Sequence, residues 1–377
     1  PYGAFSILNN GAQDAVAVTD DRVAVLGQCT PIFDVATPGS TVAVLDTGEM
    51  GRDLAATPDG RLLAIRGGRT GTYNMGAGLF IVDLLSGSIL ANTPGQPSNN
   101  TGIPFSFDVD SVVTSNDHAA FVSLTGTSAE PTTRVTIFDL STAPTGMPSV
   151  VFETVSGGLD QDQPGAPHDI AMTPDGQYVA VRSELSVGLY RLDGPQTRRV
   201  WHKRLIGEPG PFGFSAMDSV EATDDWIATI SRDSNGGFAA QLDLFDIAGN
   251  QRFNDILGDP HDLTFTPDGE RLLVRTSAGL YLYDLTSVPA GDQVPFAISR
   301  PMSSSHTSFG AGMDSLVATD DTAVTLSREG EETLIEIWDV GTKTLDVRGG
   351  GVMSNRPLDL EISPDETLLG IAGTRMA

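Results

Sequence analysis

The sequence of 377 residues predicts an all-β fold built from eight copies of one hairpin unit. In Pro260–Arg275, apolar and polar residues alternate from Asp262 to Thr266, Pro-Asp-Gly follows as a turn signal, and a second β-rich run begins at Arg271. Seven other stretches repeat this unit in register. Each copy has Asp at its second position and Asp or Asn six residues later: Asp14/Asp20, Asp53/Asp59, Asp110/Asn116, Asp169/Asp175, Asp218/Asp224, Asp262/Asp268, Asp314/Asp320 and Asp359/Asp365.

A third strand follows the hairpins and ends in a hydrophobic-Asp pair, as at Phe33-Asp34 and Phe245-Asp246. A fourth strand then follows, for example at Thr41–Leu45, Arg199–Leu205 or Val294–Ile298. Four consecutive antiparallel strands that recur along a chain are typical of the blades of a propeller. Because copies with Thr/Ser-Pro-Asp alternate with looser copies, the sequence predicts an eight-bladed β-propeller of four blade pairs.

The last hairpin is followed by the end of the sequence, so its third strand must come from elsewhere. Gly3–Asn9 resembles the third strand Gly279–Leu285, and we expect it to complete the C-terminal blade and close the ring. Closure removes the exposed sheet edges that would otherwise template aggregation. The composition shows no domain boundary, which predicts one propeller domain over residues 1–377.

Two of the hairpins also resemble a known repeat. PHDIAMTPDGQYVAVR followed by GLYRLD, and PHDLTFTPDGERLLVR followed by GLYLYDL, are similar to the YVTN-type and lactonase-like β-propeller repeat. The resemblance covers nearly the whole chain as repeats. It implies a β-propeller that is frequently secreted or displayed on the cell surface, in a family of binding proteins, scaffolds and some enzymes.

The net charge of −27 restricts the partners. Nucleic acid and anionic membranes would repel this chain, so neither is expected to bind it, whereas cations or a basic partner would be attracted. No apolar run approaches the ~20 residues that span a bilayer, so no membrane insertion is expected. Acidity also keeps an exported protein soluble, which together with the resemblance predicts an extracellular, cell-surface or periplasmic location.

The leading aspartates are expected to ring one mouth of the central channel. One interpretation is that surplus carboxylates of this ring hold a hard cation such as Ca²⁺, which prefers oxygen ligands. The candidate ligands are Asp14, Asp110, Asp169, Asp218, Asp314 and Asp359. The other is that each Asp accepts hydrogen bonds from backbone N–H groups of its own or the next blade. Three arginines are positioned to pair across the hairpin: Asp53 with Arg66, Asp169 with Arg182, and Asp262 with Arg275.

Several further residues are candidates for binding. His168 and His261 directly precede leading aspartates and could bind a metal, act as a base or anchor a loop. Asp160 and Asp162 form the densest oxygen cluster in a long loop. Three loops that lead into the looser copies carry aromatic residues that could cover neighbouring blades or contact a partner: Phe105, Phe212 and Phe309.

These patterns support two functional hypotheses. The first is a noncatalytic binding or scaffold propeller in an extracellular assembly, which presents its long-loop face to a protein or a polysaccharide. The second is a metal-assisted hydrolase of the lactonase-like type at the acidic channel mouth, with His168 or His261 assisting. The sequence contains no nucleophile elbow, HExxH, P-loop or CxxCH motif, which favours the noncatalytic hypothesis.

Overall fold

The described part of the chain consists of β-strands, turns and short connections, and contains no helix. The structure is a computed structural model. It describes residues 16–26, 30–37, 39–45, 50–68, 77–93, 112–126, 131–143, 149–153, 163–164, 167–183, 186–192, 198–205, 219–232, 239–258, 260–276, 279–286, 315–329, 332–342, 344–351 and 355–375.

The strands form eight separate antiparallel sheets within these residues, numbered here as sheets 1 to 8 in chain order. Sheet 1 contains β1 (Val16–Val18), β2 (Arg22–Val25), β3 (Thr30–Asp34) and β4 (Thr41–Leu45). Sheet 2 contains β5 (Met50–Ala56), β6 (Leu62–Gly68), β7 (Ala77–Asp83) and β8 (Ser88–Thr93). Sheet 3 contains β9 (Val112–Thr114), β10 (His118–Gly126), β11 (Pro131–Asp139), β12 (Ser149–Glu153) and β13 (Gln163–Pro164). Sheet 4 contains β14 (Pro167–Met172), β15 (Tyr178–Ser183), β16 (Ser186–Arg191) and β17 (Arg198–Arg204). Sheet 5 contains β18 (Val220–Ala222), β19 (Trp226–Arg232), β20 (Ala239–Asp246) and β21 (Gln251–Gly258). Sheet 6 contains β22 (Pro260–Phe265), β23 (Arg271–Thr276) and β24 (Gly279–Asp284). Sheet 7 contains β25 (Leu316–Ala318), β26 (Thr322–Glu329), β27 (Glu332–Asp339) and β28 (Thr344–Gly351). Sheet 8 contains β29 (Asn355–Ile362) and β30 (Leu369–Arg375).

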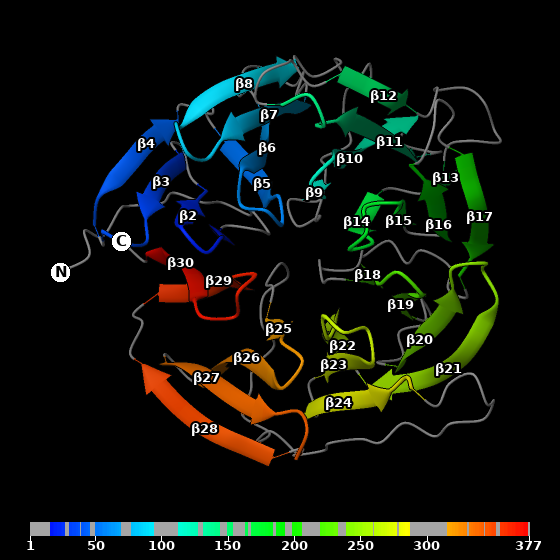
Figure 1. The fold of residues 1–377 in the computed structure, drawn as a ribbon. Helices are drawn as coiled ribbons and strands as arrows, with labels where there is room; N and C mark the ends of the chain where they lie inside the picture. Colours follow the sequence, from blue (N-terminus) through cyan, green and yellow to red (C-terminus); the bar gives the residue numbers. More distant parts are fainter. Residues whose placement is uncertain are drawn as a thin grey trace.

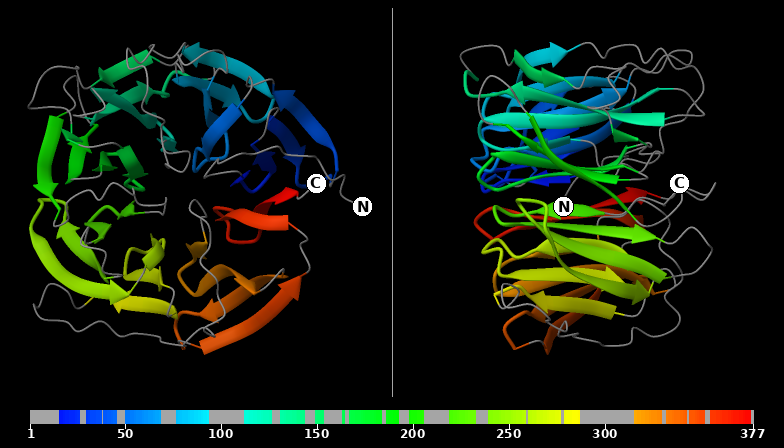
Figure 2. Two further views of the ribbon diagram at one scale, coloured as in Figure 1. Left: turned by 180° about the vertical axis from the view of Figure 1, so that it is seen from behind. Right: turned by 90° about the vertical axis from the view of Figure 1, so that its right-hand side faces the viewer.

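The sheets are arranged radially around a common centre, with the first strand of each sheet innermost and the fourth strand at the rim (Figure 1). Figure 2 shows the same ring from behind and from the side. The predicted strand order within the blades is confirmed, and β3, β7, β11, β20, β24 and β27 all end at the predicted Asp.

Four features differ from the pattern of four-stranded sheets whose first strand begins at the leading Asp. Sheet 8 has two described strands, β29 and β30, and its predicted third strand lies outside the described residues. Sheet 3 gains a short extra strand, β13, which pairs with β11. Sheet 6 has three described strands, because the predicted fourth strand at Val294–Ile298 lies outside the described residues. The aspartates Asp53, Asp169, Asp262 and Asp359 do not begin their strands but follow a β-bulge inside them.

The core lies between sheets rather than within one central layer. Each pair of consecutive sheets encloses an apolar cluster, because strand residues alternate between the two faces of a sheet. In sheet 2, for example, Leu63 and Ile65 pack on sheet 1, whereas Leu62 and Ala64 pack on sheet 3. Such clusters occur between all seven consecutive pairs of sheets, and an eighth joins Val16 and Val18 of sheet 1 to Leu368 of sheet 8.

The first and last sheets are therefore in contact. The Val16 N–H donates to Asp359 Oδ2 (2.7 Å), and the Val18 N–H donates to Glu361 Oε2 (2.7 Å). A Cβ atom on Gly370 would lie 2.4 Å from the Val18 side chain, which shows how closely the two sheets approach. The predicted pairing of Phe5–Leu8 with the C-terminal hairpin falls outside the described residues and stays a prediction.

The Pro-Asp-Gly turns have the backbone conformation that the sequence predicts. Gly60, Gly176 and Gly269 have positive φ angles of 66–68°, a region that glycine adopts without steric cost. In sheet 8 the equivalent residue is Glu366, which has a φ of 61°. A side chain in this left-handed region is strained, at a cost of roughly 1–2 kcal/mol.

We therefore expect Glu366→Gly to raise the free energy of unfolding by about 0.5–1 kcal/mol, measured by urea denaturation. Glu270→Gly is the matched control, because Glu270 directly follows Gly269 and is not among the described non-glycine residues with positive φ. There the same change should destabilise the chain, since it only adds freedom to the unfolded state. Destabilisation by both substitutions would show that Glu366 is not strained.

Candidate functional site

The leading aspartates of the Pro-Asp copies connect neighbouring sheets. Asp53 Oδ2 accepts the Val112 N–H of sheet 3 (2.7 Å), and Asp262 Oδ2 accepts the Ser315 N–H of sheet 7 (2.6 Å). Asp169 Oδ2 accepts the N–H groups of Ser219 and Val220 in sheet 5, the latter at 2.6 Å. With the bond from Val16 to Asp359 described above, all four carboxylates are buried and reach the first strand of the following sheet, or its immediate start.

A second set of hydrogen bonds joins the same sheets at the turn end of the inner strands. The backbone N–H of each Pro-Asp turn donates to an Asp or Asn of the looser copy that follows. The bonds are Asp59 to Asn116 (2.9 Å), Asp175 to Asp224 (3.0 Å), Asp268 to Asp320 (2.8 Å) and Asp365 to Asp20 (3.1 Å). The two sets therefore join sheets 2 to 3, 4 to 5, 6 to 7 and 8 to 1, each time a Pro-Asp copy to the looser copy that follows it.

The turn aspartates also have the predicted local role. Asp59 Oδ1, for example, accepts hydrogen bonds from Thr57 Oγ1 (2.6 Å) and from the Arg61 N–H (3.0 Å). The sequence reasoning missed the contact of Asp20, Asn116, Asp224 and Asp320 with a neighbouring sheet. Their regular spacing carried that signal, but one copy alone does not show which neighbouring sheet donates the N–H group.

The three predicted arginines lie opposite the predicted aspartates in the strand register: Asp53 faces Arg66, Asp169 faces Arg182, and Asp262 faces Arg275. All six side chains are at most 3% exposed. Burial lowers the pKa of Arg275 to about 10, while the carboxylates of Asp262 and Glu336 act in the opposite direction. Arg182 Nε donates to the Ile230 carbonyl (3.4 Å) of sheet 5. Direct Asp–Arg ion pairs at these three positions stay a prediction.

The predicted calcium ligands are only partly described. Asp14, Asp110, Asp218 and Asp314 lie outside the described residues. In Asp169 and Asp359 the second oxygen, Oδ1, accepts the N–H of the following residue, at 2.7 and 2.6 Å. Both side chains thus behave as the alternative interpretation expects. Within the described ranges, no group of three or more His, Cys, Asp or Glu residues could hold a metal ion.

The remaining candidates are placed as follows. His168 occupies the bulge before Asp169 and is buried; burial, and next the charge of Arg182, lower the pKa of its imidazole to about 3. It is neutral at pH 7 and is a weak base. His261 lies in β22, and its side chain is not described. Asp160, Asp162, Phe105, Phe212 and Phe309 lie outside the described residues.

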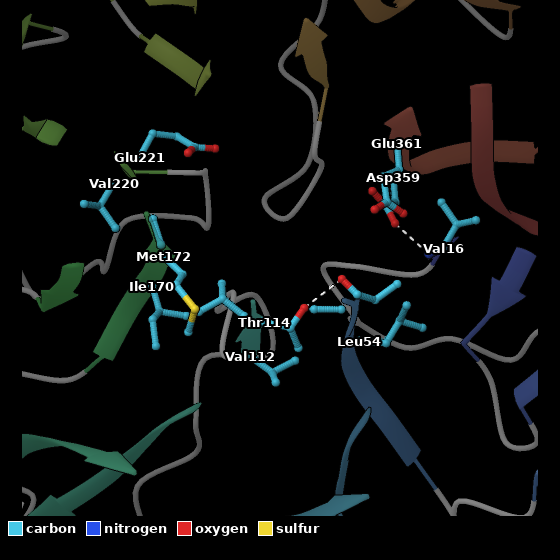
Figure 3. Close-up of a pocket in the computed structure, with 14 residues that line it drawn as sticks. Val16, Leu54, Val112, Thr114, Ile170, Met172, Val220, Glu221, Asp359 and Glu361 are labelled. Atoms are coloured by element: carbon cyan, nitrogen blue, oxygen red, sulfur yellow. Dashed lines mark hydrogen bonds between the residues drawn. The ribbon is translucent and has the colours of Figure 1, made fainter. Parts of the chain in front are cut away.

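The structure adds a site that the sequence analysis did not find. A cavity of about 280 Å³ lies at the centre of the ring, lined mostly by apolar side chains of the inner strands such as Val112, Ile170 and Met172. Three acidic residues line it: Glu221 of β18 lies on one side, and Asp359 and Glu361 of β29 lie on another (Figure 3). Glu361 also lines a second cavity of about 240 Å³, formed by Pro58, Pro267 and Pro364 of the turns.

Both glutamates stand where related repeats have other residues. Glu361 corresponds to Ala55, Ala171 and Thr264 in the Pro-Asp copies, and Glu221 corresponds to Ala17, Val113 and Val317 in the looser copies. This departure from the repeat was the signal that could have revealed them. A carboxyl group among small and apolar residues at the inner strand indicates a function or a cost that the other repeats avoid.

The surroundings of the two carboxyls disfavour their ionised forms. Burial, together with the charges of Asp169 and Asp262, raises the pKa of Glu221 to about 8, against a smaller opposing effect of its hydrogen bond from the Ala222 N–H. Burial and the charge of Asp359 raise the pKa of Glu361 well above its usual range, although the Val18 N–H opposes this.

Comparison of the sequence with protein-family models and with curated proteins finds no match. Solved structures do match in fold. A chain of a mitotic checkpoint complex is 13% identical with a TM-score of 0.55, and the match covers 98% of this chain and 92% of that one. The Cps50 (Swd1) β-propeller domain of Myceliophteria thermophila is 12% identical with a TM-score of 0.53, covering 98% and 96%. Hydrazine synthase of Kuenenia stuttgartiensis is 12% identical with a TM-score of 0.52, covering 100% and 98%.

These likenesses establish the fold. The chain is a β-propeller repeat protein, made of antiparallel sheets arranged around a centre. In the part of the chain that the structure describes, no helix is long and apolar enough to cross a membrane.

The raised pKa values predict a pH dependence of stability. In the unfolded chain both glutamates ionise near pH 4.3, whereas in the folded chain Glu221 stays protonated up to about pH 8. Folding therefore takes up protons, and the free energy of unfolding falls as the pH rises through this interval. His168 has the opposite effect, because its pKa of about 3 in the folded chain is lower than in the unfolded chain, but only below about pH 6.5.

We therefore expect the melting temperature to fall between about pH 6.5 and pH 8, where the opposing effect of His168 has ended, and Glu221→Gln to make this fall smaller. Glutamine resembles the protonated carboxyl and does not ionise. Scanning calorimetry at several pH values measures the slope, and Glu270→Gln, at an exposed turn residue, is the control that should leave it unchanged. Equal slopes in wild type and Glu221→Gln would contradict the prediction.

Proposed function

We propose that residues 1–377 form one eight-bladed propeller whose ring is closed by the N-terminal strand. Three observations support this architecture. The described residues contain eight sheets, and sheet 1 is hydrogen-bonded to sheet 8 by the same two kinds of bond that join sheets 2 and 3. Within the described part of the chain β30 pairs only with β29, so the other edge of β30 is available to Gly3–Asn9.

This closure predicts a specific effect of shortening the chain. A chain that begins at Asn10 lacks the proposed strand, so its melting temperature should fall by several degrees and the amide hydrogens of Leu369–Arg375 should exchange faster. Removal of residues 376–377 is the control and should change neither. If the shortened chain melts like the full chain and protects the same amides, the closing strand is elsewhere.

For its activity, we propose a noncatalytic scaffold that binds another protein. The observation that carries this proposal is the use of the predicted acidic side chains: the described aspartates of the inner strands hold neighbouring sheets together, and each is buried. Carboxylates committed to backbone N–H groups are poorly suited to metal-assisted hydrolysis. His168 gives no support to the hydrolase hypothesis either, because it is buried and a weak base.

The partner is proposed to bind the face opposite the Pro-Asp turns. The connections 94–111 and 205–219 each lead from the fourth strand of one sheet to the first strand of the next, so they begin and end on that face. The segment 285–315 begins on the turn face, after the third strand β24, and reaches the opposite face where β25 begins. These three segments carry the aromatic residues Phe105, Phe212 and Phe309, a residue type enriched at protein interfaces. An extracellular, cell-surface or periplasmic location, and calcium at the acidic mouth, stay predictions that fit the charge of −27.

Site-specific photo-crosslinking in the native host tests the proposal. A photoreactive residue at Phe105, Phe212 or Phe309 should become covalently joined to one recurring protein. The same residue at Asp21, Asp117 or Asp225, exposed on the turn face, is the matched control and should not. Crosslinks from the turn face alone would place the partner on the other side. Crosslinks to polysaccharide, or lactone hydrolysis that His168→Asn abolishes, would replace a protein scaffold with another function.

A further inference from the structure

The central cavity combines three properties of a binding site for a small organic cation. Its volume of about 280 Å³ is just below the ~300 Å³ at which pockets for drug-sized ligands begin, so its ligand is small. Most of its lining residues are apolar, with Val112, Val113, Ile170 and Met172 among them, although polar atoms make up the larger share of its exposed wall. Glu221 and Glu361 are two of its polar groups, and among the described lining residues none is basic.

The two carboxyl groups lie on different sides of the cavity. Figure 3 shows Glu221 on one side and Glu361, next to Asp359, on the other, with apolar side chains along the wall between them. They belong to β18 and β29, in sheets that are three places apart in the chain. One metal ion needs ligands that converge, and no such group of three occurs among the described residues. Two separated cationic groups on one flexible molecule need no convergence.

Neighbouring charges strengthen the preference for a cation. Asp169 and Asp262 lie close enough to Glu221, and Asp359 to Glu361, to disfavour a further negative charge there. A positively charged group that enters the cavity reverses this effect, because it interacts favourably with both glutamates and with the aspartates behind them. Glu361 also borders the second cavity among the turns, which offers a route of entry from that face.

We propose that the central cavity binds a linear aliphatic diamine, with one ammonium group at Glu221, the other at Glu361, and the methylene chain against the apolar wall. The primary ammonium group has three donors and forms charge-assisted hydrogen bonds with carboxylates. Methylene groups that leave water against apolar side chains add to the affinity. A monoamine can satisfy one glutamate only, and an anion of the same length is excluded by charge. This site is independent of the proposed protein-binding face.

Isothermal titration calorimetry with the full chain tests the proposal. The titration is run at about pH 9, where Glu221 is largely ionised and alkylammonium groups are still charged. The probes are a homologous series of linear diamines, with butylamine and butanediol as the matched controls that carry one and no ammonium group. We expect affinity to peak at one chain length and to exceed that of butylamine about tenfold or more, the ratio that about 1.4 kcal/mol gives. Equal affinity for the diamines and butylamine, or no binding, would overturn the proposal.

Variants locate the binding site. Glu221→Gln should reduce the affinity for the best diamine to that of butylamine, and Glu270→Gln on the exposed turn should leave it unchanged. Glu361→Gln should have the same effect as Glu221→Gln. Because Glu361 also accepts the Val18 N–H, its variant is checked for folding, and Glu221→Gln decides the result if Glu361→Gln unfolds. Full affinity in a folded Glu221→Gln protein would place the diamine elsewhere.

Discussion

Hydrogen bonds between neighbouring inner strands are the constraint on which the rest of this structure depends. β1, β9, β18 and β25 each pair with one strand of their own sheet, so the N–H groups on their other edge need acceptors from outside the sheet. A buried N–H group without an acceptor costs about as much as a lost hydrogen bond. The carboxylates of Asp359, Asp53, Asp169 and Asp262 supply these acceptors. One residue type, repeated in register, thus supplies acceptors to the free edge and joins two neighbouring sheets.

The aspartate hydrogen bonds and the apolar clusters are distributed differently over the contacts between sheets. Apolar clusters occur between every pair of neighbouring sheets, whereas the paired aspartate bonds occur at alternate contacts, 2 to 3, 4 to 5, 6 to 7 and 8 to 1. The contact between the first and last sheets has a small cluster, with Val16 and Val18 as its fully buried residues. The aspartate hydrogen bonds also join these two sheets. The polar bonds therefore occur at contacts with large apolar clusters, such as 2 to 3, and also at this one, where they bring together two sheets that are far apart in the sequence.

Most of the fold could be predicted from the sequence, because a repeat presents the same evidence many times. The hairpin turns, the third strands that end in Asp and the fourth strand at Thr41–Leu45 all follow from local propensity. What joins one unit to the next could not be derived in this way. Asp20 and Asn116 look like turn residues in their own copy, and their acceptor role depends on a backbone N–H in another sheet. The central cavity could not be predicted from the sequence, because Glu221 and Glu361 line the same cavity only when the sheets are arranged in a ring.

The inter-sheet bonds also determine the electrostatics of the channel. Val220 donates its N–H to Asp169, and the next residue along β18, Glu221, presents its carboxyl to the cavity. The charge that holds sheets 4 and 5 together therefore lies directly behind the channel wall, and it contributes to the raised pKa of Glu221. The same relation holds on the other side, where Asp359 binds Val16 and raises the pKa of Glu361. A substitution that removed either aspartate would weaken the sheet contact and the field together. The bonds between sheets thus place carboxylates beside the centre, where they oppose a further negative charge at Glu221 and at Glu361.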